Sequence, residues 1–319
     1  MRILLWHVHG SWTTSFVQGP HEYVVPVLPD RGPDGVGRAR TWSWPSSVVE
    51  LPPEQLSGES FDLVVLQRPH ELRLVEEWTG RRPGLDLPAL YLEHNTPPEA
   101  SSSAAHPMSG AGIPIVHVTH FNALFWDCGA ARTTVIEHGV VDPGSRYTGE
   151  IAHAAVVTND PVRRWRTVGA DLLAPLSAAA PIDVFGMRVD QLPAATGLPP
   201  HRLRPYEDLP QAAMHAELAR RRVYVHTTRW TSLGLALLEA MHLGMPVVAL
   251  ATTEAPRAVP ASAGVVTASV AEMTVAIGRL IADPETAQLL GKGAREAVAA
   301  RYSLERFLDD WETLLQRVA

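Results

Sequence analysis

The stretch WTSLGLALLEAMHLGMPVVAL, residues 230–250, places one carboxylate, Glu239, midway along an otherwise apolar helix pattern. Ser232 is a residue type that caps helices, Gly244 suits a left-handed position at the helix end, and Pro246 stops the helix before an apolar run. The pattern therefore predicts a helix that leads into a buried strand, and it raises the question of what the carboxylate does.

The start of this helix has the composition of a phosphate site. Thr231, Ser232 and Gly234 are small, and the first N–H groups of a helix are free donors with a partial positive charge. Glu239 follows Gly234 by a distance of about 7 Å along a helix axis. A phosphate at the helix start would bring an attached sugar within reach of this carboxylate. The alternative is that Glu239 faces solvent on the polar side of the helix.

Length and composition limit the class of protein. The chain has 319 residues, of which 46% are hydrophobic and 19% charged, as in a soluble protein with about two domains. A net charge of -7 with scattered Lys and Arg argues against a nucleic-acid groove or a polybasic membrane face. No segment resembles a signal peptide or a membrane span, so we expect a cytoplasmic protein. The single cysteine, Cys128, excludes an intramolecular disulfide and a cysteine metal cluster.

Short apolar runs alternate with helix-like segments along the whole chain. The strand patterns of the first half cover residues 2–8, 22–28, 62–68, 89–94, 114–120 and 133–140. Those of the second half cover residues 154–159, 182–187, 201–206, 222–228, 245–250 and 263–268. This alternation predicts an α/β protein with two Rossmann-like, mostly parallel sheets.

Two irregular segments punctuate this pattern. The polar run 140–150 contains Pro and Gly and is typical of a linker, whereas the loop 29–40 is either a lid on the acceptor side or a solvated excursion. We expect an N-terminal domain over 1–145, a C-terminal domain over 146–301 and a helix over 302–319 that crosses back to the N-terminal domain. Ser303 is a capping residue type, and the helix carries apolar residues at helical spacing: Leu304, Phe307, Leu308, Trp311, Leu314 and Leu315.

Three stretches together resemble the family 4 glycosyltransferases, of the actinobacterial type, which have the GT-B fold of two Rossmann-like domains. TVIEHGVVDP (134–143) is similar to their interdomain signature, residues 223–249 to their donor-site block, and YSLERFLDDWETLL (302–315) to their terminal helix. The resemblance covers almost the whole chain. It implies a retaining glycosyltransferase, with the acceptor on the N-terminal domain and a nucleotide diphosphate sugar mainly on the C-terminal one.

The resemblance also implies a donor site made of Gly10, Arg164, Tyr206, Thr231, Ser232, Leu233, Gly234 and Glu239. In it, the backbone of the helix start holds the phosphates, Glu239 holds the ribose and Tyr206 borders the base. The family has a second glutamate where this chain has Thr231. That substitution implies either an unusual donor sugar or one that is held more loosely.

The family's R-x4-K pair, which neutralises the donor diphosphate, corresponds here to Arg163 and Val168. Either Arg164 or Arg166 could supply the missing cation, because guanidinium groups grip phosphate oxygens well. We expect this segment to open a helix-like stretch, with Arg163 and Arg166 stabilising the charge of the leaving diphosphate. The alternative is a solvated basic loop.

Histidines at strand ends are the remaining candidates, because ligands of open α/β sheets collect at the carboxyl ends of the strands. His94 matches the family histidine that lines the cleft near the transferred sugar, and we group it with the catalytic residues. His7, His9 and His120 are acceptor-side candidates, for which a structural role is the favoured alternative.

Metal and cofactor chemistry is not expected. No Asp-x-Asp motif is present, Asp309 and Asp310 lie on the polar face of the terminal helix, and His7 and His9 lack a third ligand nearby in sequence. The sequence thus predicts a metal-independent glycosyltransferase whose partners are a nucleotide sugar and a small-molecule or glycan acceptor. The alternatives are an epimerase or hydrolase of the same fold, or a non-catalytic protein that binds sugar nucleotides.

Overall fold

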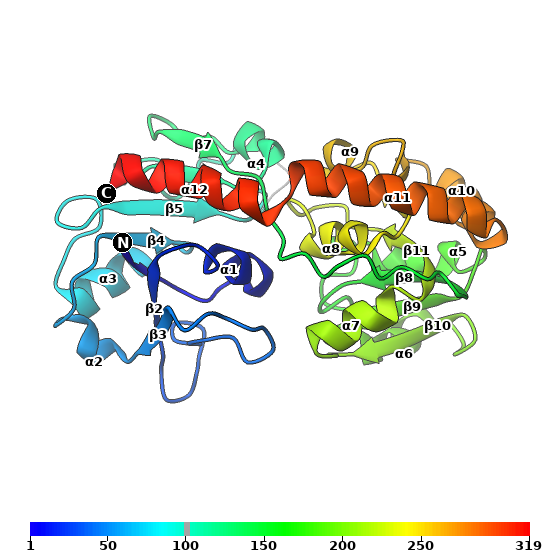
Figure 1. The fold of residues 1–319 in the computed structure, drawn as a ribbon, viewed down its shortest axis with the longest axis horizontal. Helices are drawn as coiled ribbons and strands as arrows, with labels where there is room; N and C mark the ends of the chain where they lie inside the picture. Colours follow the sequence, from blue (N-terminus) through cyan, green and yellow to red (C-terminus); the bar gives the residue numbers. More distant parts are fainter. Residues whose placement is uncertain (99–102) are drawn as a thin grey trace. The chain divides into compact units, whose positions relative to one another are not determined.

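A computed structural model describes residues 1–98 and 103–319 of the chain. The chain forms two compact units, one made of Met1–Val141 with Leu304–Ala319 and the other of Asp142–Ser303. Each unit is built on one parallel sheet with helices packed against it (Figure 1). The predicted α/β class with two Rossmann-like sheets is confirmed.

The first unit contains a seven-stranded sheet in the order β3-β2-β1-β4-β5-β6-β7. The predicted strands are all present, although most are shorter than their apolar runs, and residues 48–51 form a strand that we did not predict. The order reverses between β1 and β4, as in a Rossmann fold. The strands are β1 Arg2–Leu5, β2 Glu22–Pro26, β3 Val48–Leu51, β4 Leu63–Leu66, β5 Ala89–Glu93, β6 Ile115–His117 and β7 Thr133–Val135.

The last helix of the chain, α12 (Leu304–Val318), belongs to this first unit (Figure 1, red). Its apolar residues recur every four positions, so Phe307, Trp311 and Leu315 are buried on one stripe. The Trp311 ring lies 5.6 Å from that of Trp12 and 4.9 Å from that of Phe16, measured between centroids. The other helices of the unit are α1 Gly10–Phe16, α2 Pro53–Leu56, α3 Glu71–Thr79 and α4 His120–Phe125.

The second unit contains a six-stranded sheet in the order β10-β9-β8-β11-β12-β13, which reverses between β8 and β11. All six predicted strands are present. They are β8 Ile151–Val157, β9 Ile182–Gly186, β10 Leu203–Glu207, β11 Arg221–His226, β12 Val247–Leu250 and β13 Gly264–Thr267. Val184 of β9 and Val225 of β11 lie in one buried core with Ile277 of α10. Within each strand every second residue faces this core, because side chains alternate between the two faces of a sheet.

Seven α-helices are described in this unit: α5 Leu173–Leu176, α6 Leu192–Thr196, α7 Gln211–Leu218, α8 Leu235–Leu243, α9 Ala255–Ala258, α10 Val270–Ala282 and α11 Pro284–Arg301. Two short 3-10 turns, Ala170–Leu172 and Val189–Gln191, precede α5 and α6. Of these helices, α8 carries Glu239 and α10 covers the core face of the sheet.

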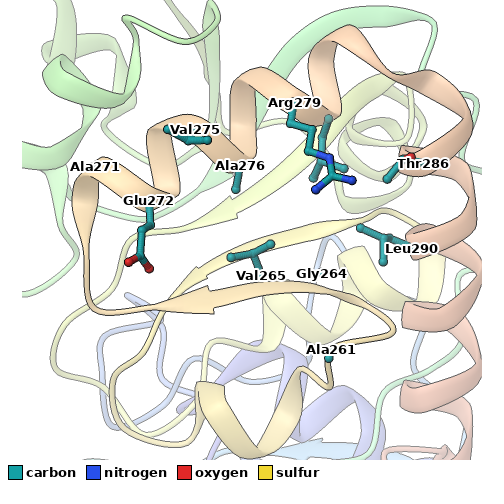
Figure 2. Close-up of a pocket in the computed structure, with 11 residues that line it drawn as sticks. Ala261, Gly264, Val265, Ala271, Glu272, Val275, Ala276, Arg279, Thr286 and Leu290 are labelled. Carbon is teal, nitrogen blue, oxygen red and sulfur yellow. The ribbon is translucent and has the colours of Figure 1, made fainter.

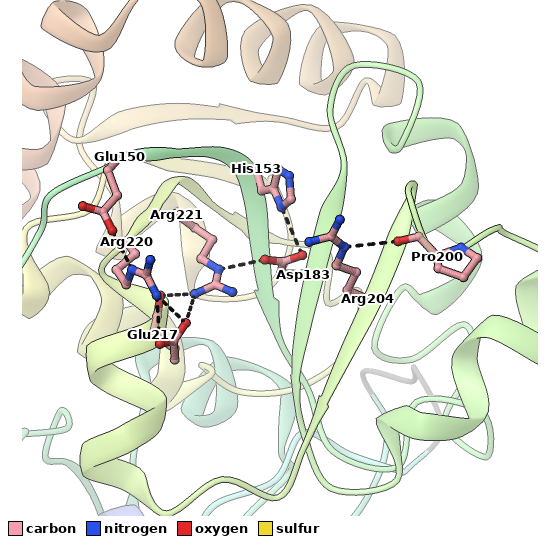
Figure 3. A network of polar contacts seen from close by, with 8 residues as sticks. All are labelled: Glu150, His153, Asp183, Pro200, Arg204, Glu217, Arg220 and Arg221. Atoms are coloured by element: carbon pink, nitrogen blue, oxygen red, sulfur yellow. Dashed lines mark hydrogen bonds and ion pairs between the residues drawn. The ribbon is translucent and has the colours of Figure 1, made fainter.

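A buried charge network holds the amino ends of β8, β9 and β11 together (Figure 3). Arg221 donates from Nε to Asp183 Oδ2 at 2.8 Å and from Nη1 to Glu217 Oε2 at 2.5 Å. His153 Nδ1 lies 3.2 Å from Asp183 Oδ1. Both charges of the Arg221–Asp183 pair are almost fully buried, so removing either side chain would leave an unpaired buried charge. This network lies at the amino ends of the strands, opposite the carboxyl ends where ligands are expected.

Candidate functional site

The loops at the reversal point of each sheet carry many of the predicted site residues. In the first unit, His7, His9 and Gly10 follow β1. In the second unit, the segment 160–168 follows β8 and the segment 227–234 follows β11. Parallel sheets bind ligands at this point, because neighbouring loops diverge there and leave backbone groups open.

The first unit brings two predicted histidines into contact. The rings of His9 and His94 lie 3.9 Å apart between centroids, and the Trp12 and His94 rings are nearly perpendicular, with centroids 5.3 Å apart. His94 is buried and its Nε2 lies 2.9 Å from Gln67 Oε1. None of these contacts of His94 was predicted from the sequence, because the residues involved come from segments that follow three different strands, β1, β4 and β5.

These two rings and His138 form a group that we call the histidine cluster. Burial lowers the pKa of His94 well below its usual range, and positive charge on His9 or His138 would lower it further. Burial also lowers the pKa of His9 to about 4 and that of His138 to about 3. The cluster is therefore uncharged at neutral pH. We missed His138, although it lies within the stretch that resembles the interdomain signature.

His7 is held by the loop 29–40. Its Nδ1 donates to the Gly37 carbonyl at 2.9 Å, its ring packs 4.8 Å from that of Trp44, and burial lowers its pKa. Arg31 pairs with Glu50 at 2.9 Å, which ties the same loop to β3. The loop is thus anchored to the rest of the unit at these contacts, and its function as a lid stays a prediction.

Gly10 and His120 are both the first residues of short helices. A Cβ atom on Gly10 would lie 2.2 Å from the indole of Trp42, so a side chain there would require Trp42 to move. His120 begins α4 and is exposed, whereas Thr119 caps this helix by accepting a hydrogen bond from Asn122 N at 3.1 Å. His120 is therefore not part of the buried histidine cluster.

In the second unit, α8 begins later than predicted. Its first residue is Leu235 and its N-cap is Gly234, which makes no side-chain cap. Ser232 is buried two positions earlier, so the prediction that it caps the helix is wrong. A Cβ on Gly234 would lie 2.9 Å from His226 Cε1, which explains the glycine. Gly244 ends the helix at φ 88°, as predicted.

Glu239 is buried, with only 4% of its surface exposed. His215 Nε2 donates to its Oε2 at 3.0 Å, and Gln211 Nε2 lies 3.4 Å from its Oε1. Both partners come from α7, and neither was predicted from the sequence. The alternative in which Glu239 faces solvent is therefore wrong, because a buried carboxylate is held there by specific donors.

The predicted phosphate-binding arginines are mostly exposed. Arg163, with 71% of its side chain exposed, donates from Nε to Asp160. Arg166 is 75% exposed, and its Nη1 lies 3.4 Å from Asp171 Oδ2. The segment forms consecutive turns that lead directly into the 3-10 turn at 170–172 and α5, which agrees with the expected helix-like stretch. Arg164 is more buried, and this burial lowers its pKa, with the Arg163 charge lowering it further.

Val168, at the position of the missing lysine, is 4% exposed and packs in the core of the unit. A further cation lies close to the arginine segment. Arg229 donates to Asp171 from Nη1 at 2.6 Å and from Nη2 at 2.8 Å, and Nη1 also donates to the Arg166 carbonyl at 2.9 Å. The hydrogen bond with Arg229 lowers the pKa of Asp171. We missed Arg229, whose only signal was its place shortly before Thr231.

The remaining donor-side residues are spread over two strand ends. Thr231 and Leu233 lie in the loop between β11 and α8, where Leu233 is buried and Thr231 is half-buried. The Tyr206 ring on β10 stacks on Phe185 at 4.7 Å between centroids, and the Arg221 guanidinium lies 4.7 Å from the Tyr206 centroid. Tyr206 is thus partly covered, and its contact with a base stays a prediction.

A cavity of about 530 Å³ lies elsewhere in this unit, between β13, α10 and α11 (Figure 2). Its walls are mainly apolar, with Glu272 and Arg279 of α10 as the charged residues. It contains none of the predicted site residues, so it does not bear on the donor site.

Two properties of the described residues concern metals and membranes. No group of three or more His, Cys, Asp or Glu side chains in residues 1–98 and 103–319 is arranged to hold a metal ion. None of the helices in the same part of the chain combines the length and hydropathy needed to cross a membrane. Asp309 and Asp310 are exposed on α12, as predicted.

Comparisons with known proteins place this geometry in a wider context. Residues 184–283 match a family model described as Glycosyl transferases group 1. This segment contains Tyr206, Glu239 and the loop before α8. No curated protein matches the chain.

Solved structures of similar fold cover nearly the whole chain. Sucrose-phosphate synthase from Thermosynechococcus elongatus has a TM-score of 0.73 at 14% identity, over 99% of this chain and 98% of its own. HepE from Anabaena, in complex with UDP-glucose, has a TM-score of 0.71 at 15% identity, over 99% and 100%. AviGT4, a glycosyltransferase involved in avilamycin A biosynthesis, has a TM-score of 0.64 at 14% identity, over 100% and 98%.

These likenesses confirm that the fold is GT-B. At such low identities they show the fold alone, and the family model matches only residues 184–283 of the second unit. Together, the fold and the family model support the predicted enzyme class, a glycosyltransferase.

Proposed function

We propose that this protein transfers a sugar from a nucleotide diphosphate sugar to a hydroxyl acceptor, with retention of anomeric configuration and without a metal ion. The observation that carries the proposal is the buried Glu239 carboxylate, which lies inside α8 beyond a helix start without a side-chain cap. A free helix start suits phosphates, and a carboxylate one turn further on suits the hydroxyl groups of a ribose.

The second unit supplies the charges that such a donor needs. Arg163 and Arg166 are exposed and exchange their carboxylate partners, Asp160 and Asp171, for phosphate oxygens when the donor binds. In a retaining transfer, the departing phosphate oxygen accepts the proton of the acceptor hydroxyl. The reaction then depends on positioning and on charge stabilisation rather than on a side-chain base.

The first unit supplies uncharged groups. His94 and His9 contact the sugar or the acceptor as neutral rings, because burial keeps their pKa values low. Gly10, at the start of α1, approaches the donor phosphates through its backbone, and His7 and His120 border the acceptor. These assignments, like those to family 4, to its actinobacterial type and to a cytoplasmic location, rest on the resemblance of the sequence.

A screen of nucleotide sugars by thermal shift tests the proposal first, because a ligand that binds only the native state raises the unfolding temperature. UDP-glucose is the first donor to try, since the similar HepE structure contains it. Release of nucleoside diphosphate should then require an acceptor. Release without an acceptor would indicate a hydrolase, conversion of the sugar without release an epimerase, and binding without either reaction a non-catalytic protein.

Glu239 gives the sharpest test of the donor site. Losing hydrogen bonds to a charged acceptor should weaken nucleotide binding by roughly tenfold to several hundredfold in Glu239→Ala and by less in Glu239→Gln. The bare diphosphate should show the same loss as the full donor, because the contact is to ribose. Thr231→Ala should weaken only the full donor. Calorimetric titration measures all of these, and unchanged diphosphate affinity in a folded Glu239→Ala protein would exclude the ribose contact.

A further inference from the structure

Gln67, the first residue after β4, is fixed at both ends of its side chain. Its Nε2 donates to the Trp6 carbonyl at 2.6 Å, and its Oε1 lies 2.9 Å from His94 Nε2. Its backbone is held as well, because Gln67 N donates to the buried carboxylate of Glu71 at 2.6 Å and Tyr91 Oη donates to Gln67 O at 3.2 Å. The amide group thus has one orientation.

This orientation determines where His94 carries its proton. A backbone carbonyl can only accept, so the Gln67 atom that faces Trp6 O must be the NH₂ group. The atom that faces His94 is then the amide oxygen, which also can only accept. His94 Nε2 must therefore carry the hydrogen, and in the neutral ring Nδ1 has the lone pair.

The ring cannot easily turn to exchange its two nitrogens. His9 packs against it at 3.9 Å between centroids, and the Trp12 ring lies nearly perpendicular to it with the centroids 5.3 Å apart. A flip would also break the bond to Gln67 in a buried site, which costs more than the same bond in water. Among the described residues, none donates a hydrogen bond to His94 Nδ1.

We propose that Gln67 is a positioning residue that holds His94 in the Nε2–H tautomer, so that Nδ1 accepts a hydrogen bond from a substrate hydroxyl. The second half of this statement rests on the proposed function. The arrangement favours a group that can donate a hydrogen, such as a sugar hydroxyl, and disfavours a carboxylate or phosphate oxygen, which can only accept.

The tautomer can be read without any substrate. Long-range ¹H–¹⁵N correlation spectra of protein labelled at histidine distinguish the two ring nitrogens, and the spectrum of His94→Gln identifies the His94 signals. The wild type should show His94 with the proton on Nε2 alone. In Gln67→Met, which has a similar volume and no amide, we expect a mixture of both tautomers.

Two variants serve as controls. Gln67→Glu in its protonated form has the same pattern of one donor and one acceptor and should keep the Nε2–H tautomer. Tyr91→Phe removes the bond to the Gln67 carbonyl, leaves the amide in place and should also keep it. A single Nε2–H tautomer in Gln67→Met would overturn the proposal.

Kinetics test the second half. Loss of a group that orients a ring typically lowers activity on the order of tenfold to a hundredfold, so kcat/KM should fall by that factor in Gln67→Met and much less in the two controls. Mixed tautomers with unchanged kcat/KM would show that Nδ1 does not bind substrate. A wild type that binds no nucleotide sugar would refute the proposed function, and the spectra would still decide the role of Gln67.

Discussion

The predicted site residues at the carboxyl ends of the strands have different surroundings in the two units. In the first unit, His94 and its neighbours in the histidine cluster are largely buried and uncharged, and a chain of hydrogen bonds fixes His94. In the second unit, Arg163 and Arg166 are exposed and charged, and each forms an ion pair with one carboxylate. The buried histidines are thus uncharged at neutral pH, whereas the exposed arginines carry formal charges.

This difference follows from what each edge would bind. A sugar or acceptor hydroxyl is neutral and directional, so it is recognised by buried groups with a fixed orientation. A diphosphate is charged and strongly hydrated, and guanidinium groups already paired with carboxylates can bind it by exchanging partners at low cost. Substitutions at the buried histidines and at the exposed arginines should therefore have different effects on stability and activity.

Arg163→Ala should have the largest effect. Removing a cation from a developing charge raises the barrier by about 2–4 kcal/mol, whereas stability should hardly change because the side chain is 71% exposed. Arg188 is the matched control, since it is also exposed and also pairs with Asp160. Steady-state kinetics of Arg163→Ala and Arg188→Ala should differ, and equal turnover in both variants would place the diphosphate clamp elsewhere.

Gly10→Ala should destabilise the first unit through packing at the start of α1. The added Cβ would meet the Trp42 indole at 2.2 Å, and such overpacking costs about 1–3 kcal/mol of stability. Gly110→Ala is the control, because a Cβ there would meet no atom within 4 Å. Urea unfolding of the two variants measures the difference. Equal stability would mean that Trp42 moves aside freely.

His138 should make stability depend on pH. Its folded pKa, lowered by burial to about 3, lies below the unfolded value near 6.5, so only the unfolded chain binds the proton between these limits. Stability is retained in full above pH 6.5 and falls as the pH drops, by about 1.4 kcal/mol per pH unit for this group. His138→Gln should flatten the slope of the unfolding free energy by this amount. The two curves should run parallel above pH 7, and identical slopes below pH 6 would contradict the burial of His138.

A chelator should have the smallest effect, namely none. The cations assigned to the diphosphate are guanidinium groups, and the described residues form no metal-binding group. Turnover measured in excess EDTA should equal that in its absence. Loss of activity that Mg²⁺ or Mn²⁺ restores would show that a metal ion, rather than Arg163 and Arg166, neutralises the phosphates.

The alternation of apolar runs and helix-like segments was enough to predict two Rossmann-like sheets, because strand and helix periods are local properties of the sequence. The same holds for Gly244 at the end of α8 and for the apolar stripe of α12. Local pattern failed where the ends of elements depend on their surroundings. Ser232 does not cap α8, because it is buried two positions before the N-cap of the helix.

The partners of the site residues could not be read from the sequence. Gln67 meets His94 and His215 meets Glu239 across 27 and 24 positions of the chain, and Arg229 reaches Asp171 across 58. No periodicity encodes such pairs, since they form only when separate strands and helices pack side by side. The sequence by itself determined the order of the elements and the identity of many candidate residues. Tertiary packing alone decided which of them are buried, which are neutral and which have a fixed proton.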